Sequence, residues 1–391
     1  MNNGARKRIC AITGSRADWG LLKPVLQSIQ AHSHFELQLL ATGGHLSEQQ
    51  GYTLTDIKAD GFEPDHGLAL ELDDDSAGGI CQSLGQAVAG FGKTFQKLQP
   101  DLILLLGDRY EIFAAVQAAL ISKIPVAHIA GGDVSEGAYD DAMRHAITKM
   151  SHIHFVTNQD AKDRVMQLGE NPKDIYLCGS PGIDNIVNTP SLSQSELEKL
   201  IGMPLRERNF AITFHSATLD AEAAENQISP LLSVLEKYSN TTLVFTGANA
   251  DTDGQIINTK IQGFVSRHDN ACFHQSLGAQ GYYSLARVAD LVIGNSSSGL
   301  YEAPSLMTQS INIGSRQQGR LTGNSVIHCD NQSDAIAKAI EAGLTQTLDT
   351  FDTPYGDGTA SQCIVNALDS YSDFSHLLIK HFHRTDLSDK G

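Results

Sequence analysis

The fold is decided by residues 102–109, which read LILLLGDR. Five consecutive apolar residues indicate a strand that is buried on both faces, as in a parallel sheet covered by helices. The polar residues directly after this run mark the carboxyl end of the strand, where ligands bind in open α/β sheets. The stretch therefore predicts an α/β protein with a ligand site at this end of the sheet.

The same alternation of short apolar runs and helix-patterned stretches continues along the chain in two series, which predicts two mostly parallel sheets. We expect strands at residues 8–13, 35–41, 102–106, 125–129, 153–157 and 175–178, and then at 210–214, 242–246, 291–294 and 310–313. A Gly/Pro/Asn cluster at 179–185 separates the two series. We therefore predict one domain at 1–180, a second at 181–359, and a C-terminal helix at 360–385 that packs back on the first domain.

The composition narrows the class of partner. The 391 residues include 28 Lys and Arg against 45 Asp and Glu, and the net charge of −17 argues against nucleic acid or an anionic membrane as partner. No apolar run has the length of a membrane span. We therefore expect a cytoplasmic protein, in which an anionic ligand requires a local cluster of positive charge.

The cysteines and histidines predict neither a disulfide framework nor a metal site. The six cysteines are widely scattered and form no Cys-x-x-Cys pair, so we expect reduced thiols. No His-x-x-x-His pair with a nearby acidic residue occurs in one short segment. A Gly-x-Ser-x-Gly elbow is also absent from the sequence, which argues against serine-based hydrolysis.

Charged residues follow the first and third predicted strands. In GSRAD, at 14–18, Arg16 lies where a helix begins and where backbone N–H groups bind anions, although a surface arginine fits this pattern equally well. In GDR, Asp108 borders a dry sheet that can raise its pKa, and Arg109 stands beside it. The pair suits either a structural ion pair or an acid/base group, and its position at a strand end favours a functional role.

Three further acidic residues follow the next strand. Asp133 ends the segment HIAGGD, and Asp140 and Asp141 stand seven and eight residues later. On their own, Asp140 and Asp141 suit the start of a helix. Together with Asp108 and Asp133, they bring acidic groups from neighbouring strand ends, as proton transfer at a carbon centre requires.

Polar residues also follow the predicted strands of the second domain. His215 and Asn249 stand at two corresponding strand ends. The run NSSSG at 295–299, which contains Ser296 and Ser297, supplies hydroxyl and N–H groups suited to a diphosphate, and Glu302 could accept hydrogen bonds from ribose hydroxyls. A structural histidine and a flexible loop are the alternatives for these two features.

Six motifs span nearly the whole chain in a characteristic order: GSRADWGLLKPV, GDRYE, HIAGGD followed by DDAMRHAITKMSHIHF, CGSPGIDN, GNSSSGLYEAP and INIGSRQQGR. In this order and spacing, the sequence resembles the hydrolysing UDP-N-acetylglucosamine 2-epimerases of bacterial sialic acid and legionaminic acid pathways. The resemblance implies two Rossmann-like domains that face a central cleft, as in glycosyltransferase-B folds, with neither a metal nor a nicotinamide cofactor. It also implies a homodimer or homotetramer that takes a UDP-sugar as substrate.

The reaction that the resemblance implies has two stages. UDP is eliminated across C1–C2 of UDP-N-acetylglucosamine to leave a 2-acetamidoglucal, and water then adds to give N-acetylmannosamine with inverted C2. By matched position, the implied acid/base candidates are Asp108 and Asp140 or Asp141. Asp133, near position 130, and His215 are further catalytic candidates. The implied UDP contacts are Arg16, Arg109, His215, Asn249, Ser296, Ser297, Glu302 and Arg316.

Two positions depart from the family pattern. Many relatives have a carboxylate or a histidine where this chain has Ala130, so the base is to be sought among the acidic residues named above. Gly20 stands where some relatives have a phosphate-contacting serine. The small side chain at 130 also suits a 6-deoxy sugar, so UDP-2,4-diacetamido-2,4,6-trideoxyglucose is the alternative substrate. Hypotheses of other classes are a non-catalytic UDP-sugar-binding protein and a glycosyltransferase of the same architecture.

Overall fold

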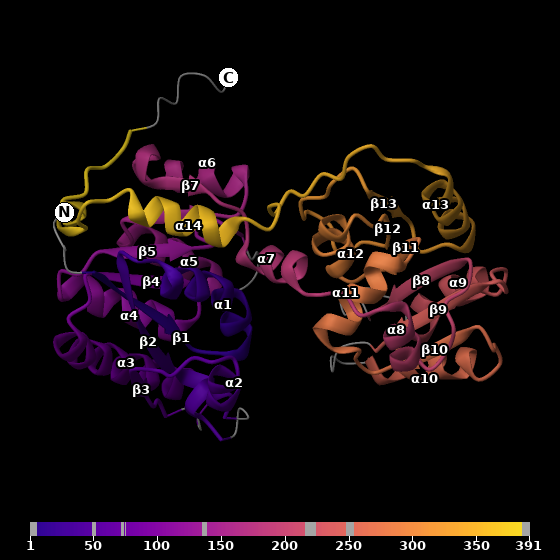
Figure 1. The fold of residues 1–391 in the computed structure, drawn as a ribbon, viewed down its shortest axis with the longest axis horizontal. Helices are drawn as coiled ribbons and strands as arrows, with labels where there is room; N and C mark the ends of the chain where they lie inside the picture. Colours follow the sequence, from indigo (N-terminus) through magenta and orange to yellow (C-terminus); the bar gives the residue numbers. More distant parts are fainter. Residues whose placement is uncertain are drawn as a thin grey trace. The chain divides into compact units, whose positions relative to one another are not determined.

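The computed structural model describes residues 6–48, 52–71, 74, 76–134, 139–215, 224–247 and 254–384 (Figure 1). The chain divides into two compact units: Met1–Asn185 with Tyr355–Gly391 forms the first, and Ile186–Pro354 forms the second. Each unit contains one parallel sheet with helices, which confirms the predicted α/β class with two such sheets. Within the described residues, no helix combines the length and the apolar character that crossing a membrane requires.

The first unit has a seven-stranded parallel sheet in the order β3-β2-β1-β4-β5-β6-β7. Its strands are β1 (Lys7–Thr13), β2 (Phe35–Thr42), β3 (His66–Leu68), β4 (Leu102–Leu106), β5 (Val126–Ile129), β6 (Ile153–Val156) and β7 (Ile175–Leu177). Its helices are α1 (Arg16–Ala31), α2 (Leu54–Ala59), α3 (Ala77–Leu98), α4 (Tyr110–Ile121), α5 (Tyr139–Met150), α6 (Gln159–Gln167) and α14 (Ala360–Asp369). The strand order reverses between β1 and β4, and the carboxyl ends of such a strand pair form the crevice in which α/β sheets bind ligands.

The two faces of β4 explain its uninterrupted apolar sequence. Leu102, Leu104 and Leu106 belong to a core cluster that includes residues of α1 and α14. Ile103 and Leu105 belong to a cluster that includes residues of α3 and α4. Since alternate side chains of a strand point to opposite faces, both faces of the strand must be apolar.

The second unit has a six-stranded parallel sheet in the order β10-β9-β8-β11-β12-β13. Its strands are β8 (Arg208–Thr213), β9 (Thr241–Thr246), β10 (Ala271–His274), β11 (Leu291–Gly294), β12 (Ser310–Ile313) and β13 (Val326–Cys329). Its helices are α8 (Gln194–Ile201), α9 (Ala224–Leu235), α10 (Gly254–Val265), α11 (Gly278–Val288), α12 (Ser298–Tyr301) and α13 (Ser333–Thr345), and the chain enters the unit through α7 (Pro181–Asn188). Here the order reverses between β8 and β11, so we expect the ligand-binding crevice of this sheet at the residues that follow these two strands.

The prediction of one C-terminal helix at 360–385 is wrong in its length. The helix α14 ends at Asp369, and a short 3-10 helix, Ser375–Leu378, follows it. The reason is a local competition for backbone groups, because the Asp373 carboxylate accepts hydrogen bonds from the Ser375 N–H at 2.9 Å and from the Ser375 hydroxyl at 2.5 Å. Such side-chain bonds favour a turn over the continuation of a helix.

The start of α14 is fixed by a carboxylate from α7. Asp184 is buried and accepts hydrogen bonds from the backbone N–H groups of Ala360 (3.0 Å) and Ser361 (2.7 Å). These N–H groups would otherwise lack partners at the helix start. The helix then packs against α1, so the C-terminal segment completes the core of the first unit.

The expectation of reduced thiols is wrong for one pair of cysteines. Cys178, directly after β7, forms a disulfide with Cys363 of α14. The two residues are 185 positions apart, so their spacing in the sequence carries no signal, and only the docking of α14 brings them together. The other four cysteines are free.

Candidate functional site

A carboxylate and a guanidinium meet at the carboxyl end of β4. Asp108 forms an ion pair with Arg144 of α5, and the two side chains are only 17% and 12% exposed. Burial raises the pKa of Asp108, Arg144 opposes this rise, and the nearby charge of Asp140 in the first turn of α5 adds to it. These three residues form a charged cluster in which Arg144 pairs with Asp108 and the charge of Asp140 lies nearby.

Asp133, which follows β5, is joined to the same cluster. Its Oδ1 accepts hydrogen bonds from Thr157 Oγ1 at 2.7 Å and from Asn158 Nδ2 at 3.3 Å. Burial raises the pKa of Asp133, while the Thr157 bond and the charge of Arg144 lower it. Arg144 therefore interacts with both Asp108 and Asp133, and these hydrogen bonds fix the orientation of the Asp133 carboxylate.

The neighbouring Asp141 has a different partner. Its Oδ2 lies 3.5 Å from the Nε2 of His145, one helical turn further along α5. The structure thus connects Asp140 with Asp108, and Asp141 with His145.

The two predicted phosphate-binding arginines of the first unit have contrasting surroundings. Arg16, at the start of α1, is 77% exposed, and its Nε lies 3.4 Å from a carboxylate oxygen of Asp56. Arg109 donates from Nε to Glu111 Oε1 at 2.6 Å, and the Glu111 side chain is only 1% exposed. Glu111 therefore holds Arg109 at the carboxyl end of β4, whereas Arg16 is a surface residue at the end of β1.

The turn after β1 requires a glycine because Glu111 is packed beneath it. A Cβ atom on Gly14 would lie 2.6 Å from Glu111 Oε1. The next residue, Ser15, caps α1 by accepting a hydrogen bond from the backbone N–H of Asp18 at 3.3 Å. The predicted anion-binding turn is thus the N-terminus of a sixteen-residue helix supported by a buried carboxylate.

Asp18 is buried under the same turn, and we expect it to make the stability of the folded protein depend on pH. Burial, together with the nearby charge of Glu111, raises its pKa to about 6. The folded state therefore holds this proton more tightly than the unfolded state, so the resulting stability is present below the ordinary pKa and is lost as the pH rises through 6. We expect Asp18→Asn to raise the free energy of unfolding by about 2 kcal/mol at pH 7.5 and to have no such effect at pH 3.5.

Thermal melts at the two pH values check this expectation. The matched control is Asp56→Asn, which removes a carboxylate of α2 that is about half exposed and lies 3.4 Å from Arg16. Equal melting temperatures of Asp18→Asn and the parent protein at pH 7.5 would show that the buried carboxyl carries no such penalty.

In the second unit, Asn295 joins the loop after β11 to the loop after β8. Its side chain accepts a hydrogen bond from the backbone N–H of His215 at 2.7 Å and donates one to the His215 carbonyl at 2.8 Å. The Asn295 carbonyl in turn accepts bonds from Gln317 Nε2 at 2.8 Å and from Arg316 Nη1 at 3.3 Å. Two predicted UDP contacts, His215 and Arg316, are therefore brought together through one buried asparagine.

The serine run leads into the short helix α12, beside a cavity of about 270 Å³. Ser296 and Ser298 line this cavity together with His215 and Tyr282, and the Ser298 and Tyr282 hydroxyls are hydrogen-bonded. Ser297 precedes α12 without capping it through its side chain. Burial raises the pKa of Glu302, against the opposing effect of a hydrogen bond with Ser298. The predicted contact Asn249 lies outside the described residues.

The sequence matches the family described as UDP-N-acetylglucosamine 2-epimerase over residues 27–369. The chain belongs to this family. It is similar to the GDP/UDP-N,N'-diacetylbacillosamine 2-epimerase (hydrolyzing) of Campylobacter jejuni, with 37% identity over 86% of this chain and 87% of that protein. It is also similar to the polysialic acid biosynthesis protein P7 of Escherichia coli, with 34% identity over 94% of each chain. The UDP-N-acetylglucosamine 2-epimerase of Neisseria meningitidis serogroup B is 33% identical over 88% of this chain and 90% of that protein.

The fold of this epimerase family member is also that of a solved structure. The crystal structure of UDP-GlcNAc 2-epimerase from Neisseria meningitidis bound to UDP-GlcNAc has a TM-score of 0.78, with 18% identity, 93% of this chain covered and 100% of that chain. At this identity the likeness concerns the fold alone.

Two residues of the site were not singled out from the sequence. Arg144 stands four residues after Asp140, a spacing that places both on one face of α5, so helical periodicity was a usable signal. In the sequence, Asn295 is one member of a polar run, because its bonds to the His215 backbone depend on the parallel pairing of β8 with β11. The place of Asn295 in the site therefore depends on knowing which strand ends are neighbours, whereas helical spacing alone points to Arg144.

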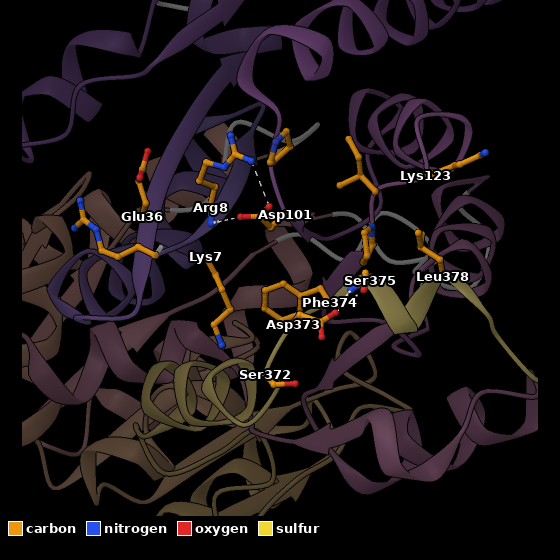
Figure 2. Close-up of a pocket in the computed structure, with 14 residues that line it drawn as sticks. Lys7, Arg8, Glu36, Asp101, Lys123, Ser372, Asp373, Phe374, Ser375 and Leu378 are labelled. Carbon is orange, nitrogen blue, oxygen red and sulfur yellow. Dashed lines mark hydrogen bonds and ion pairs between the residues drawn. The ribbon is translucent and has the colours of Figure 1, made fainter. Parts of the chain in front are cut away.

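Other polar groups of the epimerase lie at the opposite edge of the first sheet. A cavity of about 710 Å³ lies there, and Asp101 in its lining accepts a hydrogen bond from the Arg8 backbone N–H at 2.8 Å. Figure 2 shows these two residues among those that line the cavity. Among the described residues, one group has the spacing for a metal ion, namely His32, His34 and Asp369. It lies at the turn before β2, where Lys7 Nζ is 4.0 Å from the Asp369 carboxylate, so it is not part of the candidate site.

Proposed function

We propose that this protein is a hydrolysing 2-epimerase that converts UDP-N-acetylglucosamine to UDP and N-acetylmannosamine for sialic acid synthesis. The observation that carries the proposal is the cluster of Asp108, Asp140 and Arg144 after β4, in a chain whose family is that of UDP-N-acetylglucosamine 2-epimerase. Two neighbouring carboxyl groups, one of them paired with a cation, suit the removal and return of a proton at a carbon atom.

In the first stage, Asp108 removes the proton from C2 as the bond between C1 and the UDP oxygen breaks. The electron pair of the C2–H bond forms the C1–C2 double bond, and UDP leaves with the electrons of the C1–O bond. Arg144 lowers the pKa of Asp108 in opposition to burial and so favours the ionised form that this task needs. Arg16, Arg109 and Arg316 are the proposed cations that offset the charge growing on the departing diphosphate.

In the second stage, C2 receives a proton on the opposite face, and water adds its hydroxyl group to C1. The remaining proton of the water passes to the group that donated to C2, and Asp108 releases the proton from the first stage to solvent. Asp140, in the first turn of α5, is the proposed donor of the proton to C2, because its charge lies near Asp108. The hydrogen bonds of Asp133 to Thr157 and Asn158 favour a supporting role in orienting Arg144. Ser296, Ser297, Glu302 and His215 are proposed to bind the UDP moiety.

The name of one relative favours a second candidate substrate. The Campylobacter jejuni protein, at 37% identity, is named for N,N'-diacetylbacillosamine, whose sugar carries acetamido groups at C2 and C4 and lacks the 6-hydroxyl. Elimination across C1–C2 involves the same atoms in both sugars, so the chemistry of Asp108 and Asp140 is unchanged. Release of UDP from each UDP-sugar, in buffer containing EDTA, tests the proposal and ranks the two substrates.

Three outcomes of this assay separate the hypotheses. Release of UDP from either sugar in water alone supports a hydrolysing 2-epimerase. Tight UDP binding with no release would support a non-catalytic UDP-sugar-binding protein. A rate that depends on an added acceptor sugar would support a glycosyltransferase.

Arg316→Ala is expected to weaken UDP binding about 30-fold, because a hydrogen bond to a charged group is lost at the diphosphate. Isothermal titration of UDP measures the change. The control is Arg267→Ala, which removes an equal charge from an exposed turn of the same unit. Equal loss of UDP affinity in both variants would attribute the effect to the change in net charge alone. Unchanged affinity in Arg316→Ala would place the diphosphate elsewhere.

A further inference from the structure

His128 lies within β5, fully buried, and forms hydrogen bonds in two directions. Its Nε2 lies 2.8 Å from the carbonyl oxygen of Gly107, in the loop after β4. Its Nδ1 lies 3.2 Å from the hydroxyl oxygen of Thr148, on α5. The imidazole therefore connects the loop after one strand with a helix that follows another.

The partners fix the tautomer of His128. Burial, together with His154 and Arg144, lowers its pKa to about 3 against the opposing effect of the hydrogen bond with Gly107, so the ring is neutral at physiological pH. Because the Gly107 carbonyl can only accept, Nε2 carries the proton, and the single proton of the Thr148 hydroxyl is shared between His128 Nδ1 and the Arg144 carbonyl. Both ring nitrogens are engaged in these hydrogen bonds, so the ring does not transfer protons. Its contribution is to hold its two partners in position.

Each partner of His128 is adjacent to one member of the charged cluster. Gly107 directly precedes Asp108. Thr148 follows Arg144 by one helical turn, and its hydroxyl lies 2.9 Å from the Arg144 carbonyl. The imidazole is thus a direct link between the loop that carries Asp108 and the helix turn that carries Arg144.

The loop after β5 is shaped to leave room for this link. A Cβ atom on Gly131 would lie 2.8 Å from both His128 Nδ1 and Thr148 Oγ1, so a larger residue would be wedged between them. Ala130 takes a left-handed conformation, with φ of 63°, which L-residues rarely adopt. A strained residue, Ala130, and a glycine, Gly131, therefore stand beside the contact between the His128 imidazole and the Thr148 hydroxyl.

We propose that His128 is a positioning residue that fixes the Asp108 loop against α5, so that Asp108 and Arg144 meet in a productive geometry. This inference rests on the proposed function. It assigns a role to a side chain that contacts neither the sugar nor UDP.

Two substitutions separate the two hydrogen bonds. In His128→Gln the side-chain amide reaches the position of Nε2 and can still donate to Gly107, whereas in His128→Asn it reaches only the position of Nδ1. We expect His128→Gln to keep kcat within about threefold and His128→Asn to lose about 100-fold, with KM little changed in both, since small displacements of reacting groups have effects of this size. The acidic limb of the kcat profile moves to higher pH in His128→Asn, because Arg144 no longer lowers the pKa of Asp108 as strongly.

His154 provides the matched control. It is the register partner of His128 on β6, is equally buried, and bonds to Glu170 through Nε2 at 3.0 Å. His154→Asn and His154→Gln are expected to lower the melting temperature without changing kcat or the pH profile. If His128→Asn fails to fold, Thr148→Val against Thr148→Ser tests the other bond of the same link.

A readout independent of turnover completes the experiment. The carboxyl carbon of Asp108, assigned by its loss in Asp108→Asn, is titrated by ¹³C NMR in each variant. A raised midpoint in His128→Asn but not in His128→Gln or the His154 variants supports the inference, even if the protein releases no UDP and the proposed function fails. Identical midpoints together with a wild-type kcat in His128→Asn would overturn it.

Discussion

Asp108→Asn is expected to reduce release of UDP from the UDP-sugar by about 1,000-fold while UDP affinity stays within about twofold, because the change removes a general base and no diphosphate contact. Asparagine has the shape of aspartate and can still accept a hydrogen bond from Arg144, so the cluster after β4 keeps its packing. Initial rates and isothermal titration of UDP measure the two quantities separately.

The control for this variant lies at the other end of the same strand. Asp101 directly precedes β4 and accepts hydrogen bonds from the backbone and side chain of Arg8. Asp101→Asn is expected to lower stability slightly and to leave turnover unchanged. A wild-type rate in Asp108→Asn would remove Asp108 from the chemistry and direct attention to Asp133 or Asp140.

Asn295→Ala is expected to weaken UDP binding by about 100-fold, because two hydrogen bonds to the His215 backbone are lost and a buried N–H group remains without a partner. The substitution removes the bonds that join the loop after β8 to the loop after β11. The second of these loops also carries the Asn295 carbonyl, which Arg316 and Gln317 contact. Isothermal titration of UDP and a thermal melt report affinity and stability.

A second buried asparagine controls for the loss of stability. Asn270 donates from Nδ2 to the carbonyls of Tyr238 (3.0 Å) and Thr241 (2.7 Å), at the amino end of β9. Asn270→Ala should lower the melting temperature by a similar amount and leave UDP affinity intact. If both variants bind UDP as the parent does, the loop after β11 is not the UDP site.

The sequence is most informative where a single physical requirement dominates. The run of β4 is apolar throughout because both faces are buried, and Leu291, Val292 and Ile293 of β11 follow the same rule, so the sequence predicts these two strands with the bounds observed. The edge strands β3, β10 and β13 are short and mostly half-exposed, and their sequences carry no such run. They were therefore missed.

In the candidate site too, some residues can be located from the sequence and others require the folded structure. Residues that directly follow an apolar strand, such as Asp108, can be located from the pattern alone. The choice between Asp140 and Asp141 requires the side-chain geometry of α5, where Asp141 pairs with His145. The disulfide between Cys178 and Cys363 depends on the docking of α14, which no local pattern encodes.

The measurement that tests the central claim most directly is proton NMR of the protein with UDP-N-acetylglucosamine in heavy water. UDP-2,4-diacetamido-2,4,6-trideoxyglucose is followed in a parallel tube. Elimination followed by hydration predicts free UDP together with a 2-acetamido sugar of inverted C2 configuration that carries deuterium at C2. Free UDP with a sugar that keeps its original configuration and its C2 proton would contradict the account, because C2 would then never have lost its hydrogen.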